Sequence, residues 1–281
     1  MMASMASPAQ PVLTSFANPR VKATTALRDR RERDRTGLTL VDGAREVRRA
    51  LDAGAEVVEA FVSEPLLAGP DARAALDALR RGNIPIHATS EAVFAKLAFG
   101  ERAEGLLAVV RIPATALADL VLPADPLVVV IEGVEKPGNV GAVMRSADGA
   151  AANAVVAASP RTDLFNPNAI RASAGTMFTV PTGAAPTPDV LAWLRANGIR
   201  IVAARVGVGR LYTDTDVTGP VALVLGAEAD GLTDAWAADG IEAISLPMHG
   251  VADSLNVSTT AAILLYEARR QRGLPPPAGK E

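Results

Sequence analysis

Three short stretches of the sequence combine residue types that could carry out chemistry. The first places Asn139, Gly141 and Arg145 after an apolar run at 127–131, and the second places Gly226 and Glu228 after the apolar run 223–225. Amide and carboxylate groups can orient a polar substrate, and a guanidinium can stabilise a developing negative charge. Taken singly, the first stretch is also typical of a capped helix with one exposed arginine, and the second of a tight turn that Glu228 caps.

The third stretch runs from Leu246-Pro247-Met248 through a loop to 254–258, where Ser-Leu-Asn-Val-Ser opens a predicted helix. A helix N-terminus offers free N–H groups and the positive end of a dipole, which suits a carboxylate or a phosphate. Ser254 could instead act only as the helix cap. We expect all three stretches at one edge of a sheet, because ligands of parallel sheets bind at the carboxyl ends of the strands.

Two glycines in these stretches predict open space for a ligand. Gly141 and Arg145 are four residues apart and therefore share one face of the predicted helix, which leaves room beneath the guanidinium. Gly226 at the end of a strand permits close approach to the backbone. Gly138 and Asn139 are expected at the start of the helix, with the asparagine as a polar cap.

The elements that must position these residues form an α/β pattern in the second half of the chain. Runs of consecutive Val, Ile, Leu and Ala predict strands that are buried on both faces, as in a parallel sheet covered by helices. Strands are predicted at 127–131, 154–158, 201–204, 223–225 and 243–246. Helices are predicted at 140–150, 167–174, 188–197 and 255–272.

Strands and helices also alternate in the first half, which predicts a separate small α/β domain. A length of 281 residues is compatible with two domains. We expect a flexible tail at 1–12, a first domain at 13–112, a linker at 113–125 and a second domain at 126–281.

Composition excludes several kinds of chemistry. The chain has no cysteine and only two histidines, so disulfides, thiolate metal sites and cysteine nucleophiles are absent, and we expect no bound metal. No apolar stretch approaches the roughly 20 residues of a membrane-spanning helix, and the start lacks the pattern of a signal peptide. We therefore expect a cytoplasmic protein without a membrane partner.

The net charge of −3 conceals a basic segment near the start. Seven basic and three acidic residues lie between Arg20 and Arg35, in a stretch predicted to form one polar helix at 21–35. Such a face could bind the phosphates of a nucleic acid. It could equally be a solvated helix, since Arg28/Glu32 and Arg30/Asp34 are opposite charges four residues apart.

Together the three stretches resemble the SpoU (TrmH-type) family of RNA ribose 2′-O-methyltransferases within the SPOUT superfamily. Asn139, Gly141 and Arg145 match its Asn-x-Gly-x-x-x-Arg pattern, and Gly226 and Glu228 match its Gly-x-Glu pattern. The third motif, a Pro-Met turn followed by Ser-Leu-Asn-Val-Ser, occurs at 247–248 and 254–258, with Leu246 at a position where the family has Ile. The first half is similar to RNA-binding ribosomal proteins of the kink-turn type through 18–22 and 41–47.

The resemblance implies an α/β fold whose C-terminal parallel-sheet domain contains a trefoil knot and binds S-adenosylmethionine. It also implies a homodimer with the active site at or near the subunit interface. The implied catalytic residues are Arg145, Asn139, Glu228, Asn256 and Ser258. The implied donor-binding residues are Gly226, Leu246, Leu255, Leu225 and Met248. The RNA-binding candidates of the basic segment are Arg20, Lys22, Arg28, Arg31 and Arg35.

Family proposals make the arginine at the position of Arg145 the group that activates the ribose hydroxyl. A guanidinium holds its proton strongly, so phosphate binding and stabilisation of the alkoxide suit Arg145 better. An appended substrate domain favours 23S ribosomal RNA as the substrate, in either a housekeeping or an antibiotic-resistance role. The alternatives are a transfer-RNA ribose methyltransferase, an enzyme that methylates a base nitrogen, and a non-catalytic RNA-binding or ribosome-assembly protein.

Overall fold

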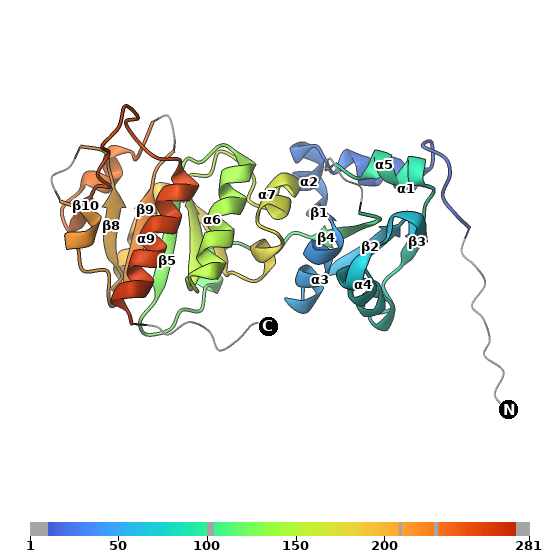
Figure 1. Ribbon diagram of the computed structural model, residues 1–281, viewed down its shortest axis with the longest axis horizontal. Coiled ribbons are helices and arrows are strands. Elements are labelled where there is room, and N and C mark those ends of the chain that lie inside the picture. Colours follow the sequence, from blue (N-terminus) through green and yellow to red (C-terminus); the bar gives the residue numbers. More distant parts are fainter. Residues whose placement is uncertain (1–10, 100–103, 208–209, 228–229, 274–281) are drawn as a thin grey trace. The chain divides into compact units, whose positions relative to one another are not determined.

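The computed structural model describes residues 11–99, 104–207, 210–227 and 230–273, and the chain divides into two compact units, 1–112 and 113–281 (Figure 1). Of the tail expected at 1–12, residues 1–10 lie outside the described residues. No helix in the described ranges is long and apolar enough to cross a membrane.

The first unit is built on a four-stranded mixed sheet with the order β1-β4-β2-β3, in which β1 and β2 run antiparallel to β4 and β3 runs parallel to β2. Its core includes the fully buried Leu40, Phe61, Phe94 and Leu107. The strands are β1 (Leu38–Asp42), β2 (Val57–Val62), β3 (Ile86–Ala88) and β4 (Leu106–Arg111). The helices are α1 (Pro19–Ala26), α2 (Arg30–Thr36), α3 (Ala44–Asp52), α4 (Gly69–Arg81) and α5 (Glu91–Leu97), with a 3-10 turn at Glu64–Leu66.

The single helix predicted at 21–35 is wrong, because the structure has two helices there. Leu27 is 4 % exposed and belongs to the core, and Asp29 caps α2 by accepting a hydrogen bond from Arg31 N at 2.8 Å. Arg28 donates to the carbonyl of Lys96 at 2.8 Å, at the C-terminus of α5. The charge pattern alone did not reveal this break, because it depends on the core and on α5.

The second unit has a six-stranded, entirely parallel sheet with the order β10-β8-β9-β5-β6-β7. Its strands are β5 (Leu127–Glu132), β6 (Ala154–Ala158), β7 (Thr182–Ala185), β8 (Arg200–Ala204), β9 (Val221–Leu225) and β10 (Ile241–Ile244). Its helices are α6 (Pro137–Gly149), α7 (Pro167–Ala172), α8 (Thr187–Ala196) and α9 (Val257–Gln271). Short 3-10 turns occur at Leu117–Asp119, Thr176–Phe178, Tyr212–Asp214 and Asp234–Ala237.

The predicted parallel sheet is confirmed, and every residue of β5, β6 and β9 is buried. Its edge strand β7 was missed, because the sequence Thr-Gly-Ala-Ala lacks the large and β-branched residues that mark a strand. The stretch expected as a linker belongs to the second unit, and Leu117, Leu120 and Leu122 pack against its core. The knotted threading implied by the resemblance stays a prediction.

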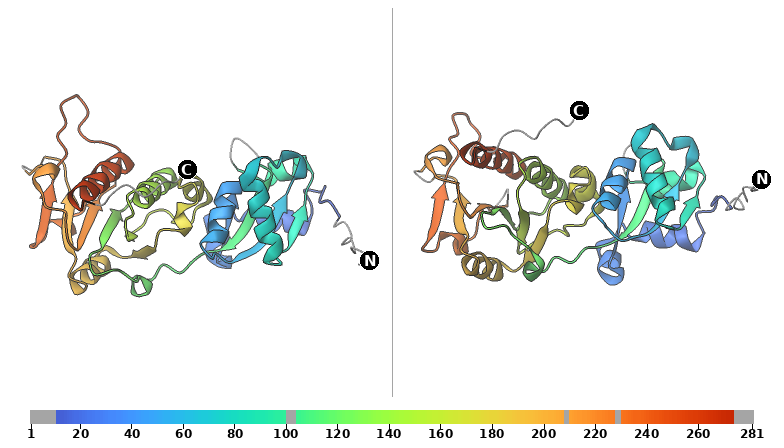
Figure 2. Two further views of the ribbon diagram at one scale, coloured as in Figure 1. Left: turned by 60° about the horizontal axis from the view of Figure 1, so that its bottom comes forward. Right: turned by 90° about the horizontal axis from the view of Figure 1, so that it is seen from below.

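Helices cover both faces of this sheet, as Figure 2 shows. α6 and α9 pack together on one face, and α8 lies on the other against β6, β7 and β8. Successive residues of a strand point to opposite faces, so Val128 and Val130 share the core of the α8 side with Leu194 and Trp236.

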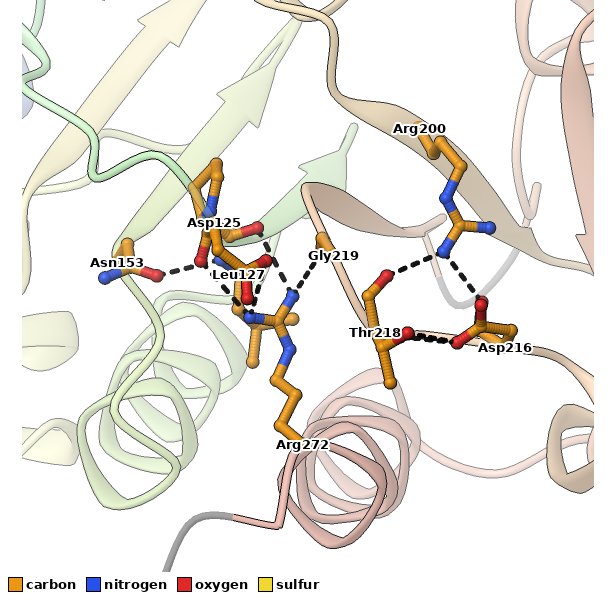
Figure 3. A network of polar contacts seen from close by, with 9 residues as sticks. Asp125, Leu127, Asn153, Arg200, Asp216, Thr218, Gly219 and Arg272 are labelled. Carbon is orange, nitrogen blue, oxygen red and sulfur yellow. Dashed lines mark hydrogen bonds and ion pairs between the residues drawn. The ribbon is translucent and has the colours of Figure 1, made fainter.

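A polar network at the amino ends of the strands joins the start of the second unit to its last helix (Figure 3). Arg272, the C-cap residue that follows α9, donates to the carbonyl oxygen of Asp125 at 3.2 Å and to the carbonyl of Gly219. Its side chain is 8 % exposed. Because these groups lie before β5 and β9, the network stabilises the sheet at the end opposite to the carboxyl edge.

Candidate active site

The three stretches with chemical potential follow β5, β9 and β10, which run parallel in one sheet. They therefore leave the sheet at its carboxyl edge, as the sequence predicted. Two of them are in direct contact, because Asn256 Nδ2 lies 3.4 Å from Asn139 Oδ1. The packing of α6 against α9 explains how residues 117 positions apart in the chain meet.

The starts of α6 and α9 differ from the expected caps. α6 begins at Pro137, so Asn139 is its third residue and not its cap. α9 is capped by Asn256, whose Oδ1 accepts hydrogen bonds from Ser258 N at 2.9 Å and Ser258 Oγ at 2.7 Å. Ser254 is therefore not the cap. The amide groups of Asn139 and Asn256 thus bring two helix N-termini, each with the positive end of its dipole, to one place.

Arg145 lies on the exposed side of α6, and its side chain makes no hydrogen bond or ion pair within the described ranges. The space expected beneath it at Gly141 is not open. A Cβ at Gly141 would lie 2.3 Å from Ala169 O and 2.7 Å from Ser173 N. The missing side chain therefore lets α6 pack against α7, and the prediction of a ligand-sized space there is wrong.

The turn after β9 is also tightly closed. A Cβ at Gly226 would lie 2.2 Å from the carbonyl carbon of Gly231 and 2.4 Å from Leu232 N. Ala227 O accepts a hydrogen bond from Gly231 N at 2.9 Å, which closes the turn. Gly226 is thus required by the fold of the turn, and the space beside its Cα is occupied by protein. Glu228, the predicted carboxylate of this motif, lies outside the described residues.

The loop after β10 offers polar backbone groups beside apolar side chains. Leu246 and Met248 are half-buried and Leu255 is 38 % exposed. Within the described chain, the backbone N–H and C=O groups of 246–255 form no hydrogen bonds. Leu225, another predicted donor-binding residue, is 2 % exposed and therefore almost wholly buried. Such a surface can hold a flat, largely apolar ring whose polar edges pair with the main chain.

Glu132 at the end of β5 is a polar group of this edge that the sequence analysis missed. Its side chain is 3 % exposed and accepts hydrogen bonds from Thr187 Oγ1 at 2.7 Å and Thr233 N at 2.8 Å. Burial alone raises the pKa of this carboxyl, but the hydrogen bonds outweigh burial and hold the pKa below its ordinary value. The available signal was a carboxylate that directly ends a run of five apolar residues.

The RNA-binding candidates of the first unit fall into two groups. Arg20 pairs with Glu59 at 3.0 Å, Arg35 pairs with Glu32, and Arg28 binds carbonyls at the end of α5. The side chains of Lys22 and Arg31 are exposed and make no hydrogen bond or ion pair with the described residues. The second group can therefore meet a phosphate without breaking a contact of the fold.

No cluster of three or more His, Asp or Glu side chains suited to a metal ion occurs in the part of the chain that the structure describes. Glu132 adds a buried carboxylate at the carboxyl edge, and the groups around Asn139 and Asn256 are amides, a hydroxyl and main-chain groups. They can orient a neutral or anionic substrate through hydrogen bonds.

Comparisons with known proteins match both units. Residues 126–266 match the SpoU rRNA Methylase family, and residues 18–108 match the MRM3-like substrate binding domain. The 23S rRNA (uridine(2479)-2′-O)-methyltransferase of Streptomyces viridochromogenes is 33 % identical over 257 residues, covering 88 % of this chain and 87 % of the relative.

Two solved structures extend this similarity to the fold of nearly the whole chain. A crystal structure of an RNA 2′-O ribose methyltransferase is 42 % identical with a TM-score of 0.84, covering 94 % of this chain and 100 % of the other. The SpoU methyltransferase AviRb of Streptomyces viridochromogenes, in complex with the cofactor AdoMet, is 31 % identical with a TM-score of 0.82. That match covers 90 % of this chain and 98 % of AviRb.

Proposed function

This chain belongs to the SpoU rRNA Methylase family of RNA 2′-O-methyltransferases, and we propose that it methylates a ribose 2′-hydroxyl of 23S ribosomal RNA. The contact between Asn139 and Asn256, which unites the first and third motifs at the carboxyl edge of the sheet, is the observation that carries the proposal. The name of the Streptomyces relative supports ribosomal RNA as the substrate, and the reaction then takes place in the cytoplasm.

S-adenosylmethionine is the methyl donor that we propose, as in the AdoMet complex of AviRb. The donor supplies an electrophilic methyl group on a sulfonium centre. The loop 246–255 fits such a molecule, because its unpaired main-chain groups can meet the edges of adenine while Leu246, Met248 and Leu255 offer apolar contact. We assign the turn at 225–227 to the same donor site, where the tight packing at Gly226 gives its backbone a fixed position.

The remaining chemistry is the activation and alignment of a ribose hydroxyl. The oxygen becomes a good nucleophile only as its proton leaves, so a group that stabilises the developing alkoxide lowers the barrier. We assign this task to the guanidinium of Arg145, which is exposed and has no partner among the described residues. In the active assembly, Asn139, Asn256 and Ser258 are assigned the task of orienting the ribose and the Arg145 that reaches it, and Glu228 is assigned the same task.

We propose that the protein works as a homodimer, in which Arg145 of one protomer reaches the donor site of its partner. The exposed position of Arg145 is consistent with this arrangement, because nothing in the described part of its own chain holds it. The first unit supplies RNA affinity, which agrees with its match to a substrate binding domain. Within it, Lys22 and Arg31 are the residues that we expect to contact phosphates.

The test is transfer of labelled methyl groups from S-adenosylmethionine to purified 23S RNA, 16S RNA and transfer RNA. Wild type is compared with Arg145→Ala and with Arg195→Ala, a matched control because Arg195 is an exposed helical arginine of the same unit. We expect 23S labelling by wild type and Arg195→Ala and a loss of at least about a hundredfold in Arg145→Ala. Labelling of transfer RNA instead of 23S RNA would contradict the substrate.

Digestion of the labelled RNA to nucleosides distinguishes the remaining alternatives. A 2′-O-methylnucleoside supports the proposal, whereas a methylated base indicates a base nitrogen as the acceptor. If the protein binds the donor but transfers no methyl group to free 23S RNA, the transfer is repeated with assembled ribosomal subunits as the substrate. Absence of donor binding favours a non-catalytic RNA-binding protein. Growth with ribosome-directed antibiotics, with and without the gene, separates a resistance role from a housekeeping one.

A further inference from the structure

We propose that Glu132 is a positioning residue for the methyl-donor site, because it holds the turn after β9 in place through Thr233. The inference rests on the proposed function, which places the donor beside Gly226 and the loop 246–255. Glu132 itself is buried and faces away from solvent, so it acts through other residues and does not touch the donor.

Glu132 is well placed for this task. It ends β5, which lies between β9 and β6 in the sheet, and the residue is 3 % exposed. Oε2 accepts from Thr233 N at 2.8 Å, while Oε1 accepts from Thr233 Oγ1 at 2.9 Å and from Thr187 Oγ1 at 2.7 Å. One carboxylate thus fixes both the main chain and the side chain of Thr233.

Thr233 is joined directly to the turn that contains Gly226. It follows Gly231 and Leu232, whose backbone atoms occupy the space beside Gly226 at 2.2–2.4 Å from an ideal Cβ position. The carbonyl of Thr233 accepts a further hydrogen bond from Arg205 Nη2 at 2.7 Å. A displacement of Thr233 therefore moves the backbone that packs against Gly226, because the contact leaves no free space to absorb it.

The second partner of Glu132 belongs to α8 and not to the turn after β9. Thr187 is the first residue of α8, and its hydroxyl lies 3.0 Å from Ser159 Oγ. Ser159 follows β6 and has a φ of 45°, a conformation that non-glycine residues seldom adopt. Thr187 and Thr233 both donate a hydroxyl hydrogen bond to Oε1 of Glu132. The two residues differ in burial, since Thr187 is 6 % exposed and Thr233 is exposed.

Because both threonine hydroxyls bind the same carboxylate oxygen, the two threonines provide a pair of variants to compare. Thr233→Val and Thr187→Val each remove one hydroxyl bond to Oε1 and keep the volume of the side chain nearly unchanged, and Thr187→Val also removes the contact with Ser159 Oγ. A purely structural role predicts the larger loss of stability at the buried Thr187 and no specific loss of donor binding at Thr233. The positioning role predicts that Thr233→Val weakens donor binding more than Thr187→Val does.

A conservative change at Glu132 provides a rescue. In Glu132→Gln the amide oxygen can accept from Thr233 N, and the amide N–H groups can donate to the two threonine hydroxyls, which rotate to accept them. Glu132→Ala leaves all three donors without their acceptor. The glutamine variant should therefore retain most of the positioning, and the alanine variant should lose it.

The experiment measures the Kd of S-adenosylmethionine by isothermal titration calorimetry on the full chain, with the thermal midpoint of each variant recorded. We expect Thr233→Val to raise the Kd at least about threefold, Thr187→Val less than about twofold, and Glu132→Ala about tenfold or more. Glu132→Gln should remain within about threefold of wild type. In methyl transfer, KM for the donor should rise in Thr233→Val while kcat changes less.

Equal Kd values for Thr233→Val and wild type, or equal increases in the two valine variants, would overturn the inference. The valine pair decides the question even where Glu132→Ala does not fold. A wild-type chain that binds no donor refutes the proposed function itself. A wild-type chain that binds donor with an unaffected Thr233→Val refutes only the role of Glu132.

Discussion

Replacing Gly141 with alanine adds one methyl group at the tightest contact between α6 and α7. The new Cβ would lie 2.3 Å from Ala169 O, 2.6 Å from Ala172 Cβ and 2.7 Å from Ser173 N. Ordinary carbon contacts are about 3.5–4.0 Å, so α7 must move away from α6 by about 1 Å. Two of the three atoms belong to the backbone, which cannot turn aside as a side chain does.

The expected cost follows from two opposing terms. Overpacking of a well-packed interior costs about 1–3 kcal/mol, and backbone contact at this distance places the cost at the upper end. Alanine is favoured over glycine inside a helix by about 1 kcal/mol. We therefore expect Gly141→Ala to lower the free energy of unfolding by about 2 kcal/mol. Because α6 also holds Asn139 and Arg145, methyl transfer should fall as well.

Urea denaturation followed by circular dichroism measures this change. Gly138→Ala is the matched control, because it lies in the same helix and a Cβ there has no neighbour within 4 Å. We expect the control to stay within about 0.5 kcal/mol of wild type. If Gly141→Ala proves as stable as Gly138→Ala, the packing role assigned to Gly141 is refuted.

Three further changes test other parts of the structure. Arg272→Ala should lower the free energy of unfolding by about 2–3 kcal/mol in urea denaturation, because carbonyls at the amino ends of the strands lose a charged donor; a change below about 0.5 kcal/mol would contradict the network in Figure 3. Because the pKa of Glu132 is lower in the folded state, its contribution to stability is present above the ordinary value of 4.5 and is lost as pH falls toward the folded pKa. The difference in unfolding free energy between wild type and Glu132→Gln should therefore shrink as pH falls below 4.5, and a difference independent of pH would contradict the assigned hydrogen bonds. In the first unit, Arg31→Ala should weaken RNA binding and reduce its salt dependence without changing the thermal midpoint. Arg28→Ala should lower the thermal midpoint, because it removes the group bound to the end of α5. Filter binding and thermal denaturation of both variants check this difference.

The parts of the fold that sequence predicted are those with a local signal. The buried strands β5, β6 and β9 consist of consecutive apolar residues, a pattern that is typical of a parallel sheet. The edge strand β7 lacked that signal, because small residues suffice where only one neighbour strand is present. The break between α1 and α2 was missed because the burial of Leu27 and the bond of Arg28 to α5 are not local properties.

The candidate site divides in the same way. By itself, the sequence determined the types and spacing of the motif residues, and hence the family and the edge of the sheet where they gather. Only the tertiary structure decided that Asn139 meets Asn256, that Gly141 and Gly226 serve close packing and not ligand space, and that Glu132 binds Thr233. The physical reason is that residue type and spacing are properties of short segments. The contacts of Asn139 with Asn256, of Glu132 with Thr233 and of Gly141 with α7 exist only after the sheet and its helices have packed, and the close approach of Gly226 to Gly231 exists only after the turn has folded.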